Sequence, residues 1–158
     1  MTPSNSLIEN IEKMIRHWNN QNIPINQLNP QRLLDFEKYR DIQLPHDFKE
    51  FYLRINGMES HFPNYTDSEG FLFYPLNYWI SAENEFMLTE HSSSFSKILI
   101  FADYMQKCWW YGVKLNDSDG TYEIGIIPYK EKFKVITDSL AEFIDYYLQD
   151  SAILYNYQ

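Results

Sequence analysis

The chain has 158 residues and is acidic, with 22 Asp and Glu residues against 13 Lys and Arg, so we expect it not to bind nucleic acid, whose phosphates are recognised largely by basic side chains. Hydrophobic residues form 44% of the chain and aromatic residues 18%, which excludes a disordered protein and predicts one domain with a single core. The single cysteine, Cys108, excludes an internal disulfide framework.

Three helices are predicted before residue 60. A capping box at Ser6 precedes an apolar stripe at helical spacing, which predicts a first helix to about residue 20. The pair Asn29-Pro30 is typical of a helix cap and a first helical residue, so a short second helix is expected over residues 30–39. A third helix is predicted over residues 45–56, before Gly57, with an apolar face formed by Phe48, Phe51, Tyr52 and Ile55.

Strands and one more helix are predicted for the rest of the chain. Apolar runs bounded by turn residues predict strands at 71–74, 97–101, 109–115, 122–127 and 133–136. Residues 80–90 fit neither a helix nor a strand and stay open between a helix and a loop. Ser139, with Glu142 three residues later, caps a final helix through Leu148.

This order of elements indicates an α+β fold. We expect an antiparallel sheet of about four to six strands, packed with N-terminal helices and a C-terminal helix. The domain is expected to span residues 1–158, with residues 1–4 and 151–158 as tails.

Four segments resemble the SUKH superfamily: Leu44–Gly57, Ile98–Asp103, Trp109–Gly112 and Ser139–Ile144. The pattern is a Leu-Pro start with an aromatic helix ending in Asn-Gly, an apolar strand followed by an acidic turn, an aromatic strand, and a Ser-capped helix. All four appear in this order, and the resemblance covers roughly residues 5–150. It implies a bacterial immunity protein or a relative of the fungal cell-wall assembly regulators.

Acidic residues are concentrated in the middle of the chain. Residues 1–54 carry seven acids and seven bases, residues 55–96 carry six acids and no base, and residues 97–158 carry nine acids and six bases. The net charges of these parts are 0, −6 and −3. The base-free stretch favours a basic protein partner; the alternative is that the acidity only supports solubility.

The strand predicted at 109–115 has large residues on both faces. Because side chains alternate along a strand, Trp110 points to the opposite face from Trp109 and Tyr111. Either other elements cover both faces at this point, or Trp110 is an exposed aromatic anchor of the kind that dominates protein interfaces.

No catalytic or metal-binding motif is recognisable. The four histidines are scattered, Cys108 is expected to be inert and buried in an aromatic strand, and no glycine-rich phosphate loop exists. We therefore expect no enzyme activity, no cofactor and no metal. The chain also lacks an apolar run long enough to span a bilayer and a signal peptide at Met1, so a cytoplasmic protein without membrane contact is expected.

The SUKH resemblance and the acidic middle segment together suggest an immunity protein that neutralises a cognate toxin by binding it. The toxin is expected to be basic, a nuclease being one class with the required basic groove. An intracellular scaffold or regulatory domain without a toxin partner is the alternative. The predicted contact residues are Glu69, Glu83, Glu85, Asp103, Trp110 and Asp117.

Overall fold

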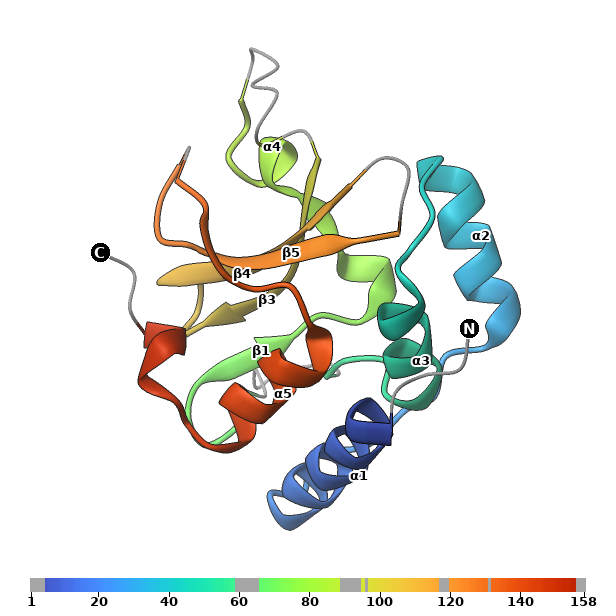
Figure 1. The fold of residues 1–158 in the computed structure, drawn as a ribbon, viewed down its shortest axis with the longest axis vertical. Helices are drawn as coiled ribbons and strands as arrows, with labels where there is room; N and C mark the ends of the chain where they lie inside the picture. Colours follow the sequence, from blue (N-terminus) through green and yellow to red (C-terminus); the bar gives the residue numbers. More distant parts are fainter. Residues whose placement is uncertain are drawn as a thin grey trace.

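The computed structural model describes residues 5–58, 66–88, 95, 97–116, 120–130 and 132–155. It consists of one antiparallel sheet with helices packed against it, so the predicted α+β class is confirmed. Helices α1, α3 and α5 contact one another beside the sheet, whereas α2 lies at the outside of the molecule and α4 at the opposite end from α1 (Figure 1).

Helices α2 and α5 form where their capping signals place them, whereas Ser6, the predicted cap of the first helix, lies within that helix. The Oδ1 atom of Asn29 accepts a hydrogen bond from the N–H of Gln31 at 2.8 Å, and the hydroxyl of Ser139 accepts one from the N–H of Glu142 at 3.2 Å. Each cap satisfies a backbone donor that the first helical turn leaves free. The helices are α1 (Asn5–Asn20), α2 (Pro30–Arg40), α3 (His46–Arg54), α4 (Ala82–Glu85) and α5 (Leu140–Leu148).

Helix α3 has the predicted apolar face but different ends. Its four predicted face residues are all buried. The helix stops at Arg54, because Ile55 is already extended, so Gly57 does not terminate it. Gly57 instead adopts a left-handed φ of 62° where the chain passes close to another segment, and a Cβ atom there would lie 2.5 Å from the backbone of Tyr74 and Pro75.

The sheet has the strand order β1-β3-β4-β5-β6, and β2 also pairs with β3. Strands β3 to β6 form an antiparallel meander, in which each strand pairs with the next one along the chain. Strand β3 continues three residues beyond the predicted end at Phe101. The strands are β1 (Phe71–Phe73), β2 (Ile80–Ser81), β3 (Ile98–Tyr104), β4 (Trp109–Leu115), β5 (Tyr122–Ile127) and β6 (Lys134–Thr137).

Strands β1 and β2 lie on the same edge of β3, and the chain leaves that edge between them. Phe73 pairs with Ala102, and Ile80 pairs with Ile100. Phe73 and Ile80 are seven positions apart in the sequence, whereas their partners in β3 are only two positions apart. We call the intervening segment, residues 74–79, the edge excursion. It contains the 3-10 turn η1 (Leu76–Tyr78).

Buried hydrogen bonds anchor the edge excursion to α3. The indole N–H of Trp79 donates to the hydroxyl of Tyr52 at 2.8 Å, and that hydroxyl donates to the carbonyl oxygen of Tyr74 at 2.7 Å. Leu76 and Trp79 are both buried. Unpaired polar groups are costly in a low-dielectric interior, so this chain of bonds fixes the excursion in one position.

Residues 80–90, left open by the sequence, begin as strand β2 and continue as one helical turn. The hydroxyl of Ser81 caps α4 by accepting a hydrogen bond from the N–H of Asn84 at 3.1 Å. Residues 89–90 lie outside the described part of the chain.

The segment 151–155 is not a tail, contrary to expectation. It forms a second 3-10 turn, η2 (Ala152–Tyr155), in which Leu154 is fully buried. The hydroxyl of Tyr111, in β4, donates to the carbonyl oxygen of Leu154 at 2.6 Å. Residues 1–4 and 156–158 lie outside the described residues.

Among the helices that the structure describes, none has both the length and the apolar character needed to cross a bilayer.

Candidate functional site

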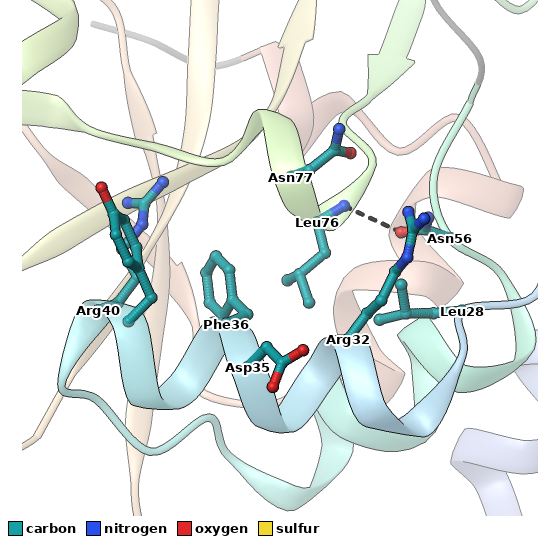
Figure 2. A pocket seen from close by; sticks show the side chains of 9 residues that line it. Leu28, Arg32, Asp35, Phe36, Arg40, Asn56, Leu76 and Asn77 are labelled. Carbon is teal, nitrogen blue, oxygen red and sulfur yellow. Dashed lines mark hydrogen bonds between the residues drawn. The ribbon is translucent and has the colours of Figure 1, made fainter.

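Among the described residues, two hollows border the edge excursion, and different residues of the excursion line each of them. The helical groove, with a volume of about 450 Å³, separates α2 from η1 (Figure 2). The acidic pocket, with a volume of about 290 Å³, lies between the excursion, α4 and the turn that joins β3 to β4. It is lined by Leu72, Tyr74, Pro75, Tyr78, Ile80, Glu85, Asp103 and Lys107.

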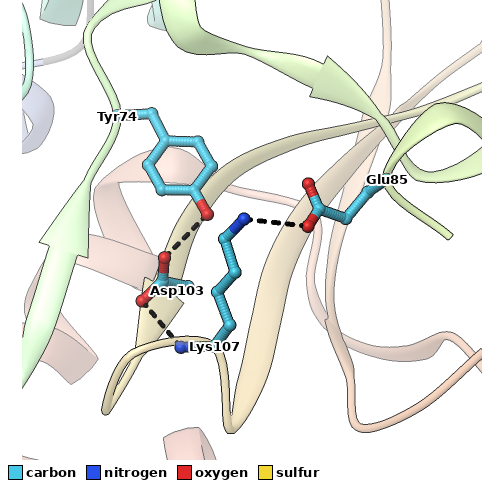
Figure 3. A network of polar contacts seen from close by, with 4 residues as sticks. All are labelled: Tyr74, Glu85, Asp103 and Lys107. Atoms are coloured by element: carbon cyan, nitrogen blue, oxygen red, sulfur yellow. Dashed lines mark hydrogen bonds and ion pairs between the residues drawn. The ribbon is translucent and has the colours of Figure 1, made fainter.

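A network of polar contacts joins four residues of the acidic pocket (Figure 3). The hydroxyl of Tyr74 donates to Oδ2 of Asp103 at 2.7 Å, and the backbone N–H of Lys107 donates to Oδ1 of the same carboxylate at 3.3 Å. The ammonium of Lys107 then pairs with Oε1 of Glu85 at 3.0 Å. The pocket therefore holds two carboxylates and one ammonium, all supplied by the chain itself.

The turn that carries Lys107 has an unusual backbone. Met105, Gln106 and Lys107 have φ values of 49°, 54° and 68°, so three consecutive residues other than glycine are left-handed. Each such residue costs about 1 kcal/mol and persists only where surrounding contacts hold it. The hydrogen bond from Lys107 to Asp103 is one of those contacts, and the bond from the N–H of Met105 to the carbonyl oxygen of Gly70, at 2.9 Å, is another.

Burial controls the protonation of the pocket residues. Asp103 is only 2% exposed, and this desolvation raises the pKa of its carboxyl group, against the effect of its hydrogen bonds from Tyr74 and Lys107. Burial and the negative charge of Asp103 both raise the pKa of Tyr74, which therefore stays protonated as a donor. The ammonium group of Lys107 is accessible by contrast, because the side chain of this residue is 53% exposed. Its partner Glu85 is more covered, with a side chain that is 14% exposed.

Replacing Asp103 by asparagine is expected to change the pH dependence of stability. Because burial raises the pKa of Asp103, the folded protein binds this proton more readily than the unfolded chain does. The resulting stabilisation is complete below the unfolded pKa of about 3.9 and is lost as pH rises through the folded pKa. The wild type should therefore gain stability relative to Asp103→Asn when urea unfolding is measured at about pH 4 instead of about pH 7. An equal free-energy difference between the two proteins at both pH values would contradict this account of Asp103.

The structure brings several of the predicted contact residues to one region. Glu85 and Asp103 both line the acidic pocket, and Glu83 lies on the same helical turn as Glu85. Trp110 pairs with Asp103 across β3 and β4, which puts the two side chains on the same face of the sheet. The Trp110 ring meets the ring of Phe86 edge to face, with centroids 4.8 Å apart, so residues after α4 partly cover it.

The other predicted contact residues behave differently. Glu69 is exposed in the turn before β1 and does not line the pocket. Asp103 was expected in an acidic turn after a strand, but it lies within the longer strand β3 and is buried. Asp117 lies outside the described residues. Cys108, expected to be buried, is exposed in the turn before β4.

Tyr74, Tyr78 and Lys107 line the pocket but were not among the predicted site residues. Their signal in the sequence is faint. Pro75 marks the end of an apolar run, yet nothing near it indicates that the chain returns to the same strand at Ile80.

Within the described residues, no group of three or more His, Cys, Asp and Glu side chains is placed to hold a metal ion. The arrangement of the acidic pocket is instead suited to binding an organic cation. A guanidinium or ammonium group can pair with Glu85 where Lys107 now does, and the Asp103 charge adds to the attraction.

Comparison with known proteins identifies the family. No curated protein matches the chain closely enough to count as a relative. The model of the SMI1 / KNR4 family (SUKH-1) matches residues 27–146, which include both hollows and most of the sheet. Since this match covers most of the 158 residues, the chain belongs to the SMI1 / KNR4 family (SUKH-1).

Proposed function

We propose that the protein is an immunity protein, which neutralises a cognate basic toxin by binding it at the acidic pocket. Membership of the SUKH-1 family supports a protein of this kind. The observation that carries the proposal is that the pocket already holds an ammonium group, from Lys107, which pairs with Glu85 at 3.0 Å and acts electrostatically on the carboxylate of Asp103. In this proposal the protein covers the active site of the toxin or a nearby surface and carries out no reaction itself.

A basic side chain of the toxin would replace the ammonium of Lys107. An ion pair with an exposed partner contributes only about 0–1 kcal/mol, so Lys107 can leave at little cost. An arginine of the toxin would gain more, because its planar guanidinium can bind a carboxylate through two parallel hydrogen bonds. The ring of Tyr78, which is 54% exposed at the pocket, is available to pack on that guanidinium.

The remaining predicted contact residues would act around this pocket. Glu83 and Glu69 would attract a basic surface and orient it, since complementary charges mainly raise the rate and specificity of association. Trp110 would provide apolar contact beside Asp103 at the part of its ring that Phe86 leaves accessible. Asp117 stays a proposed contact from its charge alone. A nuclease is the proposed toxin class, because its substrate groove must be basic.

Co-expression with the product of the adjacent upstream gene tests this function. We expect the protein to restore growth of cells that make the upstream product, and the two proteins to purify together as a one-to-one complex. The absence of both rescue and a complex would contradict the immunity proposal. That result would favour the alternative of a scaffold or regulator that binds a partner other than a toxin.

A further inference from the structure

The helical groove has a regular pattern of charge on one of its walls. Arg32, Phe36 and Arg40 follow one another at four-residue spacing, which places them on one face of α2. All three line the groove, and Leu76 and Leu28 complete its apolar floor. Figure 2 shows Phe36 and Leu76 in the middle of the groove, with Arg40 towards one end and Arg32 towards the other.

Neither arginine has an acidic partner among the described residues. Arg40 donates one hydrogen bond to the carbonyl oxygen of Trp79 at 2.5 Å, and its guanidinium carbon lies 5.2 Å from the centre of the Phe36 ring. The one acid that lines the groove, Asp35, accepts a hydrogen bond from the side chain of Gln31 at 3.0 Å. A guanidinium has five N–H donors, so both arginines keep donors for another molecule.

The groove also leaves apolar surface accessible. Leu33 is the only buried residue among those described in α2, and Phe36 is half-buried. Tyr39, at the groove, is 88% exposed. Large exposed aromatic side chains beside arginines are typical of protein interfaces.

We infer that the helical groove binds a helical segment of a second protein, in which one large apolar residue is flanked by two carboxylates. The apolar side chain enters between Phe36 and Leu76, and the carboxylates pair with Arg32 and Arg40. The two arginines are eight positions apart in α2, which corresponds to about 12 Å along the helix axis. A partner helix with acidic residues at positions i and i+8 and a leucine at i+4 matches this spacing.

This inference goes beyond the proposed function. The helical groove is suited to a negatively charged partner, whereas the acidic pocket is suited to a positively charged one. The two sites are also lined by different residues of the edge excursion. It does not depend on the identity of any toxin, because its test uses no toxin.

The test uses a synthetic alanine-rich helix with Glu, Leu and Glu at positions i, i+4 and i+8, labelled for fluorescence anisotropy. We expect saturable binding to the wild-type protein and at least a tenfold loss of affinity for Arg32→Glu. Lys38→Glu is the matched control, because Lys38 is exposed on the same helix and does not line the groove. This control should bind the peptide within twofold of the wild type.

Two further measurements separate specific binding from general charge effects. A peptide with glutamine in place of both glutamates should bind at least tenfold more weakly, and the amide signals of Leu76 and Asn77 should shift when the original peptide is titrated. Arg32→Gln, which changes the charge less, should lie between the wild type and Arg32→Glu. The inference is overturned if the peptide does not bind, if Lys38→Glu weakens binding as much as Arg32→Glu does, or if the glutamine peptide binds equally well.

Discussion

Replacing Gly57 by alanine is expected to lower the free energy of unfolding by about 3 kcal/mol. An added Cβ would lie 2.5 Å from the backbone nitrogen of Pro75 and the carbonyl carbon of Tyr74, and backbone atoms cannot move aside as a flexible side chain can. Such overpacking costs about 1–3 kcal/mol, and the left-handed φ of 62° adds about 1 kcal/mol for any residue with a Cβ. Urea unfolding of the two proteins measures the difference.

Gly120 provides the control for this prediction. It is also left-handed, with a φ of 75°, but no described atom lies within 4 Å of the position that a Cβ atom would take there. Gly120→Ala should therefore lose only about 1 kcal/mol, from the backbone conformation alone. Equal losses for the two variants would show that the close approach at Gly57 does not matter. A larger loss at Gly57 would support its role in seating the edge excursion, and through it both hollows.

Replacing Glu85 by lysine is expected to weaken binding of the proposed toxin by about 100-fold. Truncating or reversing one partner of a desolvated charge pair costs about 2–5 kcal/mol, and about 2.7 kcal/mol corresponds to this factor. The Glu85 side chain is largely covered, and the reversed charge would face Lys107 across the pocket. Surface plasmon resonance with the purified toxin measures both the association and the dissociation rate.

Two matched variants test whether position, and not total charge, causes the loss. Glu9→Lys makes the same change in net charge on an exposed site of α1, a helix that contributes no residue to the pocket lining, and should alter affinity by less than threefold. Lys107→Ala removes the internal ammonium and should tighten binding by a factor of about two to five, within the range of an exposed ion pair. A loss of affinity for Lys107→Ala would contradict the idea that Lys107 occupies the place of a toxin side chain.

The elements set by local interactions could be predicted from the sequence. Helices α2 and α5 begin directly after Asn29 and Ser139, because these side chains accept hydrogen bonds from backbone N–H groups two or three residues later in the chain. The meander of β3 to β6 was predictable for a similar reason, since short connections join neighbouring antiparallel strands.

The elements set by distant contacts could not be predicted. The return of the chain to β3 at Ile80 depends on Trp79 and Tyr52, which are 27 residues apart. The packing of residues 151–155 likewise depends on a hydrogen bond between Tyr111 and Leu154, 43 residues apart. The residues that neighbour Trp79 or Leu154 in the sequence do not indicate which distant residue each of them will contact.

The candidate site shows the same limit. Glu85 and Asp103 could be selected as contact residues from the sequence, because the charge of a side chain follows from its residue type alone. Their meeting in one pocket follows from the pairing of β2 beside β1 on the edge of β3, which places α4 near Asp103 and Lys107. The burial of Asp103 follows from the three additional residues of β3.

Hydrogen exchange of the protein, alone and in complex with the proposed toxin, tests the central proposal most directly. If the toxin occupies the acidic pocket, amides in residues 72–80, 82–88 and 103–107 should exchange more slowly in the complex, while those of α1 should not change. A stable complex that leaves these three segments unprotected, and slows exchange elsewhere, would contradict the proposal that the acidic pocket is the toxin-binding site.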